Sequence, residues 1–335
     1  MTGDTLRLLT DPELVAARRA WEGRLKGSSV SPVYLQGVHR KGASYDPESA
    51  EARMREALDA LAKHAEVIRD TEVFRPLSVD SGLYGVHFVD RIFGADVYEL
   101  DGESGNWQAR PLESPVGSLE RPDLDANPTW TAARESARAF VASGVTVPVF
   151  MLPTIASALN VGLNLYGQEL LMAMVVDPPA AHHDLEVING VLISIHEWYR
   201  ENVPAGLLHQ VACSGRYQPP GCGQICGCST QLVSAKQYEE FVAPHDDAIL
   251  SRYPDGGMIH LCGSHTQHIP VWREMRSLRA VQVNDRAAED LETYLREMPD
   301  KVYYVNPCEG MPLERVEELA KGHRIVIVYE PSRLQ

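Results

Sequence analysis

The sequence predicts an α/β protein in which eight parallel strands and their helices close into a (β/α)8 barrel. Three observations predict this fold: eight short apolar runs, helical patterns between most of them, and a length of 335 residues. The runs span residues 31–36, 75–80, 145–151, 206–213, 258–262, 278–284, 301–306 and 323–329. Apolar strands that alternate with helices are typical of a parallel sheet covered on its outer face. The length alone fits one barrel or two ordinary domains, but eight such units favour a single domain over residues 1–335.

The first 80 residues predict an N-terminal helical extension around the first two strands. Asp11-Pro12 and Asp46-Pro47 each place a capping carboxylate before a proline at the first helical position. Residues 82–128, rich in Gly, Pro, Asp and Glu, predict a long connection after the second strand. The later helices are expected over residues 130–143, 164–176, 180–201, 234–252, 266–277, 287–298 and 312–321.

Composition limits the classes of partner and compartment. The chain carries 31 Lys and Arg against 46 Asp and Glu, a formal charge of −15, which disfavours nucleic acid and anionic membranes as partners. No signal peptide and no apolar run of membrane-spanning length is evident, so we expect a cytoplasmic protein. Thiols stay reduced there, and the 6 cysteines are then expected to bind metal or react, although their even number leaves disulfides open.

The most informative stretch is the apolar run that ends in His260-Leu261-Cys262. In a buried strand, His260 and Cys262 project from the same face. Imidazole and thiolate are ligand types that zinc prefers, so the pair predicts a metal site. A buried free cysteine with no ligand role is the alternative for any single residue.

Other polar residues are expected at the carboxyl ends of the strands, where barrels of this kind place their chemistry. They are Asp80, Cys213, Asn284, Asp285, Cys308 and Glu330, and Cys222, Cys226 and Cys228 are expected in a loop on the same rim. All six cysteines would then lie on one face, which favours a metal site for the set. The Cys222–Cys228 loop could supply a ligand, hold a second metal or a cluster, carry a redox-active pair, or be a Gly-rich turn.

Zinc held by two thiolates and a neutral imidazole keeps a fourth position open. A thiol bound there loses its proton, whereas a water would become a hydroxide. Sulfur ligands soften the metal and favour a sulfur ligand in that position. His265 and His268 follow at metal-like spacing but are expected to begin the next helix.

Several segments, taken together, resemble the uroporphyrinogen decarboxylase superfamily over nearly the full length. They are residues 154–159, 167–171, 177–179 and 232–244, with His260-Leu261-Cys262-Gly263 matching a His-x-Cys-Gly variant of the family. That variant is typical of zinc methyltransferases that pass a methyl group between a corrinoid protein and a thiol such as coenzyme M. The resemblance implies a barrel, a Zn²⁺ ion and a corrinoid (methylcobalamin) as methyl donor or acceptor.

The chain departs from the family pattern at three places. Residues 37–41 replace the decarboxylase's Arg-rich motif, with Arg40 and Lys41 as the available substitutes, and its C-terminal histidine motif is missing. Asp80 matches the position of the decarboxylase's catalytic Asp. The methyltransferases take a third zinc ligand from a cysteine after the eighth strand, where this chain has Glu330; Cys308 is the expected replacement, with Cys222, Cys226 and Cys228 as competitors.

The leading hypothesis is a zinc-dependent methyltransferase with His260, Cys262 and Cys308 as ligands. Asp80 would be catalytic, and four further residues would orient the substrate or corrinoid: Tyr217, Asn284, Asp285 and Glu330. The expected partners are a small thiol, a corrinoid protein and a second copy of the chain in a homodimer. The alternatives are a metal-independent decarboxylase or lyase acting on a small carboxylic acid, and a barrel that binds a corrinoid or metal without catalysis.

Overall fold

The computed structural model describes residues 1–26, 32–100, 105–209 and 214–328, and the statements below concern these residues. Two helices open the chain: α1 (Gly3–Leu9), which was not predicted, and α2 (Pro12–Lys26), which begins as expected at Asp11-Pro12. The Asp46-Pro47 signal begins a short 3₁₀ turn, Pro47–Ser49, which continues as α3 (Ala50–Ala62). Asp46 caps this turn by accepting a hydrogen bond from the backbone N–H of Glu48.

Parallel strands form two sheets. The larger sheet has seven strands in the order β3-β1-β13-β12-β11-β10-β9, and the smaller has four in the order β2-β4-β7-β8. Their bounds are β1 Val33–Leu35, β2 Val38–Lys41, β3 Val73–Phe74, β4 Leu77–Asp80, β7 Val149–Met151, β8 Leu208–His209, β9 Gly223–Cys226, β10 Gly257–Cys262, β11 Leu278–Asn284, β12 Val302–Val305 and β13 Ile325–Val328.

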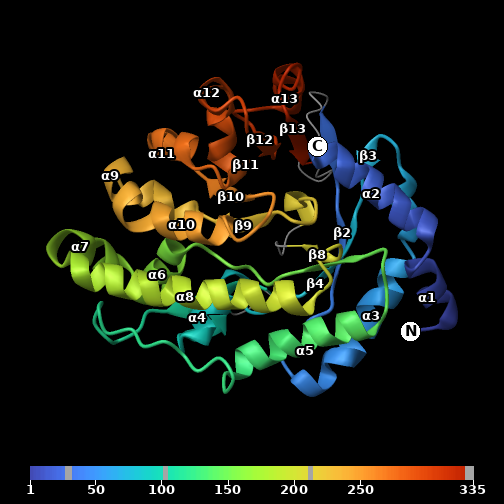
Figure 1. Cartoon of the computed structure of the whole chain (residues 1–335), viewed down its shortest axis with the longest axis horizontal. Helices are drawn as coiled ribbons and strands as arrows, with labels where there is room; N and C mark the ends of the chain where they lie inside the picture. The colour runs from blue at the N-terminus through green and yellow to red at the C-terminus, as the bar shows by residue number, and fades with distance from the viewer. Residues whose placement is uncertain (27–31, 101–104, 210–213, 329–335) are drawn as a thin grey trace.

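Two pairs of consecutive strands connect the two sheets. The predicted strand over 31–36 covers only β1 of the first pair, and the one over 75–80 covers only β4 of the second. β1 and β3 pair in the larger sheet, and their continuations β2 and β4 pair in the smaller one. β1 also pairs with the last strand, β13, and Figure 1 shows the blue start of the chain beside its red end. Strand pairing is therefore continuous from β9, through the larger sheet and then the smaller one, to β8. Within the described residues, β8 and β9 do not pair with each other. This architecture is compatible with a barrel.

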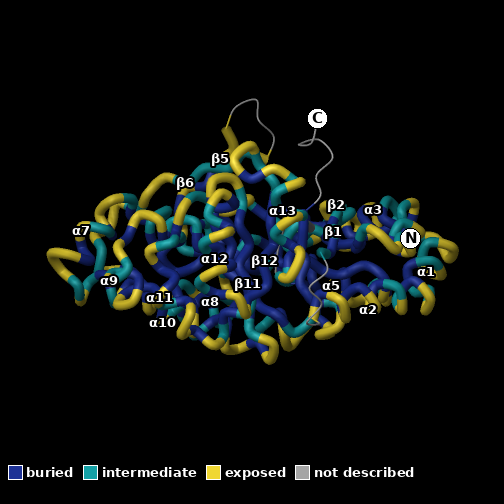
Figure 2. The backbone as a smooth tube through the Cα atoms, turned by 90° about the horizontal axis from the view of Figure 1, so that it is seen from above, coloured by how far each residue is buried: buried dark blue, intermediate teal, exposed yellow. Residues whose placement is uncertain are grey.

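The helices pack on the outside of the strands. Figure 2 shows the buried strands β11 and β12 in the middle of the molecule, with exposed residues at its periphery. The bounds of the outer helices are α5 Pro128–Ala142, α6 Ala158–Tyr166, α7 Gln168–Val176, α8 Pro178–Asn202, α9 Ala235–Gln237, α10 Ala243–Leu250, α11 Ile269–Glu274, α12 Leu291–Glu297 and α13 Leu313–Leu319. No helix among the described residues is long and apolar enough to cross a membrane.

Two predicted segments differ from the structure. The single helix expected over 164–176 is two helices, α6 and α7, because Gly167 adopts a left-handed φ of 59° that ends the first helix. The connection over 82–128 contains the short helix α4 (Phe88–Ile92) and a hairpin of β5 (Asp96–Glu99) and β6 (Trp107–Arg110). The connection is therefore partly ordered as secondary structure.

A third difference bears directly on the cysteines. The segment around Cys222–Cys228, expected as a loop, contains the strand β9, which pairs in parallel with β10. In this pairing Cys226 is the register partner of His260. The segment is thus fixed to the strand that carries the His-x-Cys motif.

Candidate metal centre

The carboxyl ends of β9 and β10 bring sulfur atoms to an imidazole. β9 ends at Cys226, and Gly227 then donates its backbone N–H to the carbonyl of His260 over 2.9 Å. A Cβ atom at Gly227 would lie 2.6 Å from Cδ1 of Ile259, so only glycine lets the Cys-Gly-Cys turn sit this close to β10. The turn therefore presents Cys226 and Cys228 next to His260.

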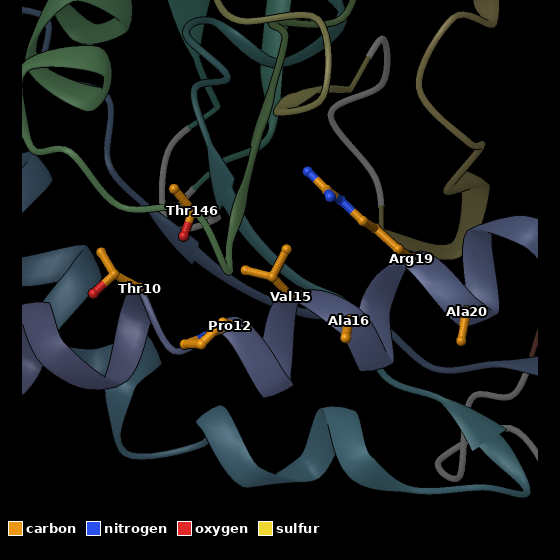
Figure 3. A pocket seen from close by; sticks show the side chains of 7 residues that line it. All are labelled: Thr10, Pro12, Val15, Ala16, Arg19, Ala20 and Thr146. Atoms are coloured by element: carbon orange, nitrogen blue, oxygen red, sulfur yellow. The ribbon is translucent and has the colours of Figure 1, made fainter.

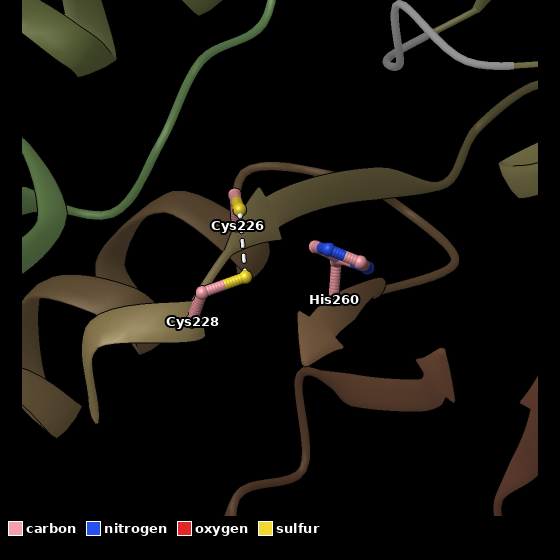
Figure 4. A group of neighbouring side chains, drawn as sticks. All are labelled: Cys226, Cys228 and His260. Carbon is pink, nitrogen blue, oxygen red and sulfur yellow. Dashed lines mark hydrogen bonds between the residues drawn. The ribbon is translucent and has the colours of Figure 1, made fainter. Parts of the chain in front are cut away.

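Cys226, Cys228 and His260 form a group that could hold a metal ion. One ligand atom from each residue lies within 4.8 Å of the other two, and the two Sγ atoms are 3.5 Å apart (Figure 4). His260 and Cys226 are buried, and Cys228 is half-buried. No other such group is present among the described residues.

Cys262 adds a third sulfur to this group. Its Sγ lies 3.1 Å from Nε2 of His260, and a further hydrogen bond joins it to Cys228. The two residues of the His-x-Cys motif therefore point to the same place, as expected for alternate positions on one strand. Three sulfurs and one imidazole converge there.

The hydrogen bonds of Gln282 determine which nitrogen of His260 is free. The Gln282 amide nitrogen donates to Oδ1 of Asn306 over 2.6 Å, so its oxygen faces Nδ1 of His260 and accepts a hydrogen bond from it. Nδ1 therefore carries the proton, and Nε2 presents its lone pair toward the cysteines. An outer hydrogen bond of this kind orients the imidazole of most metal-binding histidines.

Arg216 contacts the same lone pair. Its guanidinium lies 3.0 Å from Nε2 of His260, and because a guanidinium has only donors, Nε2 must be the acceptor. Arg216 thus places a positive charge beside His260 and near Cys226.

The thiols of the group have unequal acidity. The hydrogen bond from Cys228 is the largest cause that lowers the pKa of Cys226 and of Cys262, and the charge of Arg216 lowers the pKa of Cys226 further. Burial opposes both shifts. The pKa of Cys228 is raised, because its proton is shared with both neighbouring sulfurs. Cys226 and Cys262 are therefore the sulfurs that ionise first.

His265 and His268 support the turn and lie outside the donor group. Nδ1 of His265 is 2.9 Å from the hydroxyl of Thr230, and its Nε2 is 3.1 Å from the carbonyl of Cys262. Nε2 of His268 donates to the carbonyl of Thr230 over 2.8 Å. Burial lowers the pKa of both residues, to about 4 for His268. These neutral histidines tie the turn after β9 to the end of β10.

Asn284 and Asp285 lie beside the group, at the end of β11. Nδ2 of Asn284 is 3.9 Å from Sγ of Cys262 and 3.1 Å from Oδ2 of Asp285. Oδ1 of Asn284 is buried without a hydrogen-bond partner, and Asp285 adopts an unusual φ of 48°. Asn284 therefore holds an unused acceptor next to Cys262.

Other predicted site residues lie elsewhere. Cys222 precedes β9, so the length of the strand, about 13 Å, separates it from Cys226. Cys308 is half-buried in a turn closed by hydrogen bonds with Met311, and it is not part of the donor group.

Tyr217 is fully buried and donates to Glu22 over 2.6 Å. Cys213 and Glu330 lie outside the described residues.

Asp80 ends β4, in the other sheet. Its register partner is Lys41, and its Oδ1 accepts the backbone N–H of Gly82 over 2.7 Å. Burial raises the pKa of Asp80, and the hydrogen bond from Gly82 and the charges of His39 and Lys41 oppose this shift. Asp80 is thus a half-buried carboxyl beside cationic side chains.

A hollow of about 660 Å³ lies far from this chemistry, along α2 (Figure 3). Arg19 is the single charged residue among its lining residues, which otherwise are Thr10, Pro12, Val15, Ala16, Ala20 and Thr146. The hollow offers no acid, base or nucleophile and is not the reacting centre.

The fold resembles that of a methyltransferase. A methyltransferase from Methanosarcina mazei aligns with a TM-score of 0.65 over 93% of this chain and 92% of that chain. The aligned residues are 11% identical, so the likeness concerns the fold. No protein-family model and no curated protein sequence matches the chain.

Sequence reasoning missed Gln282 and Arg216, and it left Cys226 and Cys228 as two of several alternatives. Gln282 had a detectable signal, since it is a polar residue inside an apolar strand, two positions before Asn284. Arg216 follows a segment whose path the sequence pattern does not define, and no signal pointed to it.

Proposed function

We propose that this chain is a zinc-dependent methyltransferase that moves a methyl group between a methylcorrinoid and a small thiol. The observation that carries the proposal is the cluster of Cys226, Cys228 and Cys262 around the imidazole of His260. The likeness of the fold to a methyltransferase and the His-x-Cys-Gly motif support the class of reaction.

The donor set fits zinc. Thiolate sulfur and neutral imidazole nitrogen are its usual ligands, and two sulfurs bound to one tetrahedral zinc lie about 3.8 Å apart. The Sγ atoms of Cys226 and Cys228 are already 3.5 Å apart. We therefore propose Cys226, Cys228, Cys262 and His260 as the metal-binding residues, with Cys226 and Cys228 in the place first expected for Cys308.

In the overall reaction the methyl group passes from the corrinoid to the sulfur of the thiol. The thiol loses its proton, and the corrinoid keeps the electron pair of the broken bond. When bound, zinc lowers the pKa of a thiol that joins it, which makes the sulfur nucleophilic at neutral pH. Asn284 lies beside this position, with its Nδ2 donor 3.9 Å from Sγ of Cys262. Gln282 would hold the imidazole of His260 in the orientation that binds the metal.

A second candidate is a metal-independent decarboxylase or lyase, and Asp80 is the observation that favours it. This carboxyl is half-buried between a backbone donor and the charges of His39 and Lys41. A raised pKa suits a carboxyl to proton transfer near neutral pH. This reaction would not require the sulfur atoms, so its activity would survive in protein stripped of metal by a chelator.

Metal content is the decisive first measurement. Protein purified without an affinity tag or added metal should contain near one zinc per chain by mass spectrometry. Cys226→Ser, Cys228→Ser and Cys262→Ser should each lower this content, and Cys308→Ser and Cys222→Ser should leave it unchanged. Loss of zinc in Cys308→Ser alone would instead support the ligand first expected from the sequence.

Methyl transfer is then measured by the absorbance change of methylcobalamin with a panel of small thiols that includes coenzyme M. We expect activity that needs zinc and is lost in Cys262→Ser while folding is intact by circular dichroism. Full activity in that folded variant would contradict the proposal.

A further inference from the structure

Cys226 and Cys228 hold two thiols in contact across a single glycine. Their Sγ atoms are 3.5 Å apart (Figure 4), and the sulfurs of a disulfide lie about 2.05 Å apart. A rotation of the two side chains that brings the sulfurs together by ~1.5 Å would suffice to join them. Gly227, which packs against Ile259, keeps the turn narrow.

The two thiols differ in exposure. Cys228 is half-buried, whereas Cys226 retains 9% of its accessible surface. A small molecule that enters from solvent therefore meets the sulfur of Cys228 first. Cys226 lies directly behind it, in the position of a resolving thiol.

We propose that Cys226 and Cys228 form a reversible disulfide by exchange with a small-molecule disulfide, and that this disulfide and a bound metal exclude each other. The sulfur of Cys228 attacks one sulfur of the small disulfide while its proton passes to the Cys226 thiolate in contact with it, and a mixed disulfide forms with release of one thiolate. The released thiolate takes that proton from Cys226, whose sulfur then attacks Cys228, closes the internal disulfide and releases the second thiolate, which solvent protonates. Counted from the dithiol, the protein loses two protons and two electrons, and the small disulfide gains them.

The disulfide and the metal exclude each other because both need the same two sulfur atoms. A thiolate that has been joined in a disulfide has lost the charge with which it binds zinc. A disulfide that closes a ring across one intervening residue restricts the unfolded chain only slightly. It therefore stabilises the fold little and is expected to be easily reduced. The disulfide rests on the geometry of the dithiol, and its exclusion of metal rests on the metal site proposed above; neither requires the chain to be a methyltransferase.

The test uses the full-length, metal-free, reduced protein and oxidised glutathione. After exposure the protein is unfolded in iodoacetamide and digested with trypsin, which releases residues 217–236 as one peptide with Cys222, Cys226 and Cys228. We expect Cys222 to carry a label, while Cys226 and Cys228 carry none and have lost two hydrogens. Dithiothreitol should restore all three labels. Cys222 thus serves as a control within the same peptide.

Two further experiments test the order in which the cysteines react and the exclusion of zinc by the disulfide. Cys226→Ser should retain glutathione on Cys228, because no resolving thiol follows. Protein loaded with zinc beforehand should keep all three labels. Full labelling of the metal-free protein, a cross-link from Cys228 to Cys213 or Cys262, or equal oxidation with and without zinc would each overturn the proposal. None of these readouts depends on methyl transfer, so the two proposals fail separately.

Discussion

The side-chain oxygen of Gln282 on β11 accepts a hydrogen bond from Nδ1 of His260 on β10, and this bond leaves Nε2 of His260 as a lone pair among three sulfurs. Asn306, directly after β12, holds Gln282 in this orientation. Residues on or next to three neighbouring parallel strands therefore orient one imidazole.

Replacing Gln282 tests this relationship. Gln282→Met removes the acceptor while keeping the volume, and we expect zinc affinity to fall roughly 10- to 100-fold, as for other partners of metal-binding histidines. Gln224→Met is the matched control, because Gln224 is a buried glutamine on β9 whose Oε1 has no hydrogen-bond partner. Competition with a zinc-binding dye measures both affinities. Equal affinities in the two variants would show that Gln282 does not orient the ligand.

Gly227 should tolerate no side chain. In Gly227→Ala the new Cβ meets Ile259, and overpacking of this kind costs about 1–3 kcal/mol of the free energy of unfolding. The displaced turn should also bind zinc more weakly. Adding Ile259→Val removes the Cδ1 atom that the Cβ meets and should recover part of both losses. Gly206→Ala, where nothing lies within 4 Å of the new Cβ, is the control. Urea unfolding and zinc titration give the two readouts.

Tyr217 should act in stability and not in substrate binding. Tyr217→Phe removes a buried hydrogen bond to Glu22, a carboxyl whose pKa is raised by its burial, and should cost about 1–3 kcal/mol. Tyr199→Phe is the control, since the buried hydroxyl of Tyr199 has no hydrogen-bond partner. Urea unfolding compares the two. An unchanged stability with a raised KM for the thiol would restore the substrate-binding role expected from the sequence.

Asp246 should make the stability depend on pH. Burial raises its pKa from 3.8 to about 7, and its Oδ2 accepts a hydrogen bond from Tyr238 over 2.8 Å. The folded state therefore binds the proton more tightly than the unfolded state. The resulting stability is complete below pH 3.8 and is lost as the pH rises to about 7.

Asp246→Asn is neutral at every pH and should lack this loss. Its stability relative to the wild type should rise with pH inside that window, by at most about 1.4 kcal/mol for each pH unit. Urea midpoints measured across the window for both proteins test this. A constant difference between the two would mean that Asp246 titrates normally.

The elements that the sequence predicted best are those with long periodic signals. α2, α5 and α8 and the strands β10 to β13 lie close to their expected positions. The His260 and Cys262 side chains converge as alternate positions on a strand require. Local pattern was sufficient for each of these.

Features that depend on pairing between distant segments could not be predicted in the same way. β9 is only Gly223–Cys226, and its glycine and glutamine give no strand signal; the partner strand β10 makes it a strand. That pairing decides which cysteines meet His260. The short strands β2 and β3, which lie outside the predicted ranges, likewise depend on their neighbours.

The pairing of β1 with β13 has a consequence for how the chain folds during its synthesis. Val33 is the register partner of Val326, so the larger sheet stays incomplete until nearly the whole chain has left the ribosome. Contacts between such distant positions are slow to form. Until then β1 presents a free edge, which makes the nascent chain dependent on protection from aggregation for most of its translation.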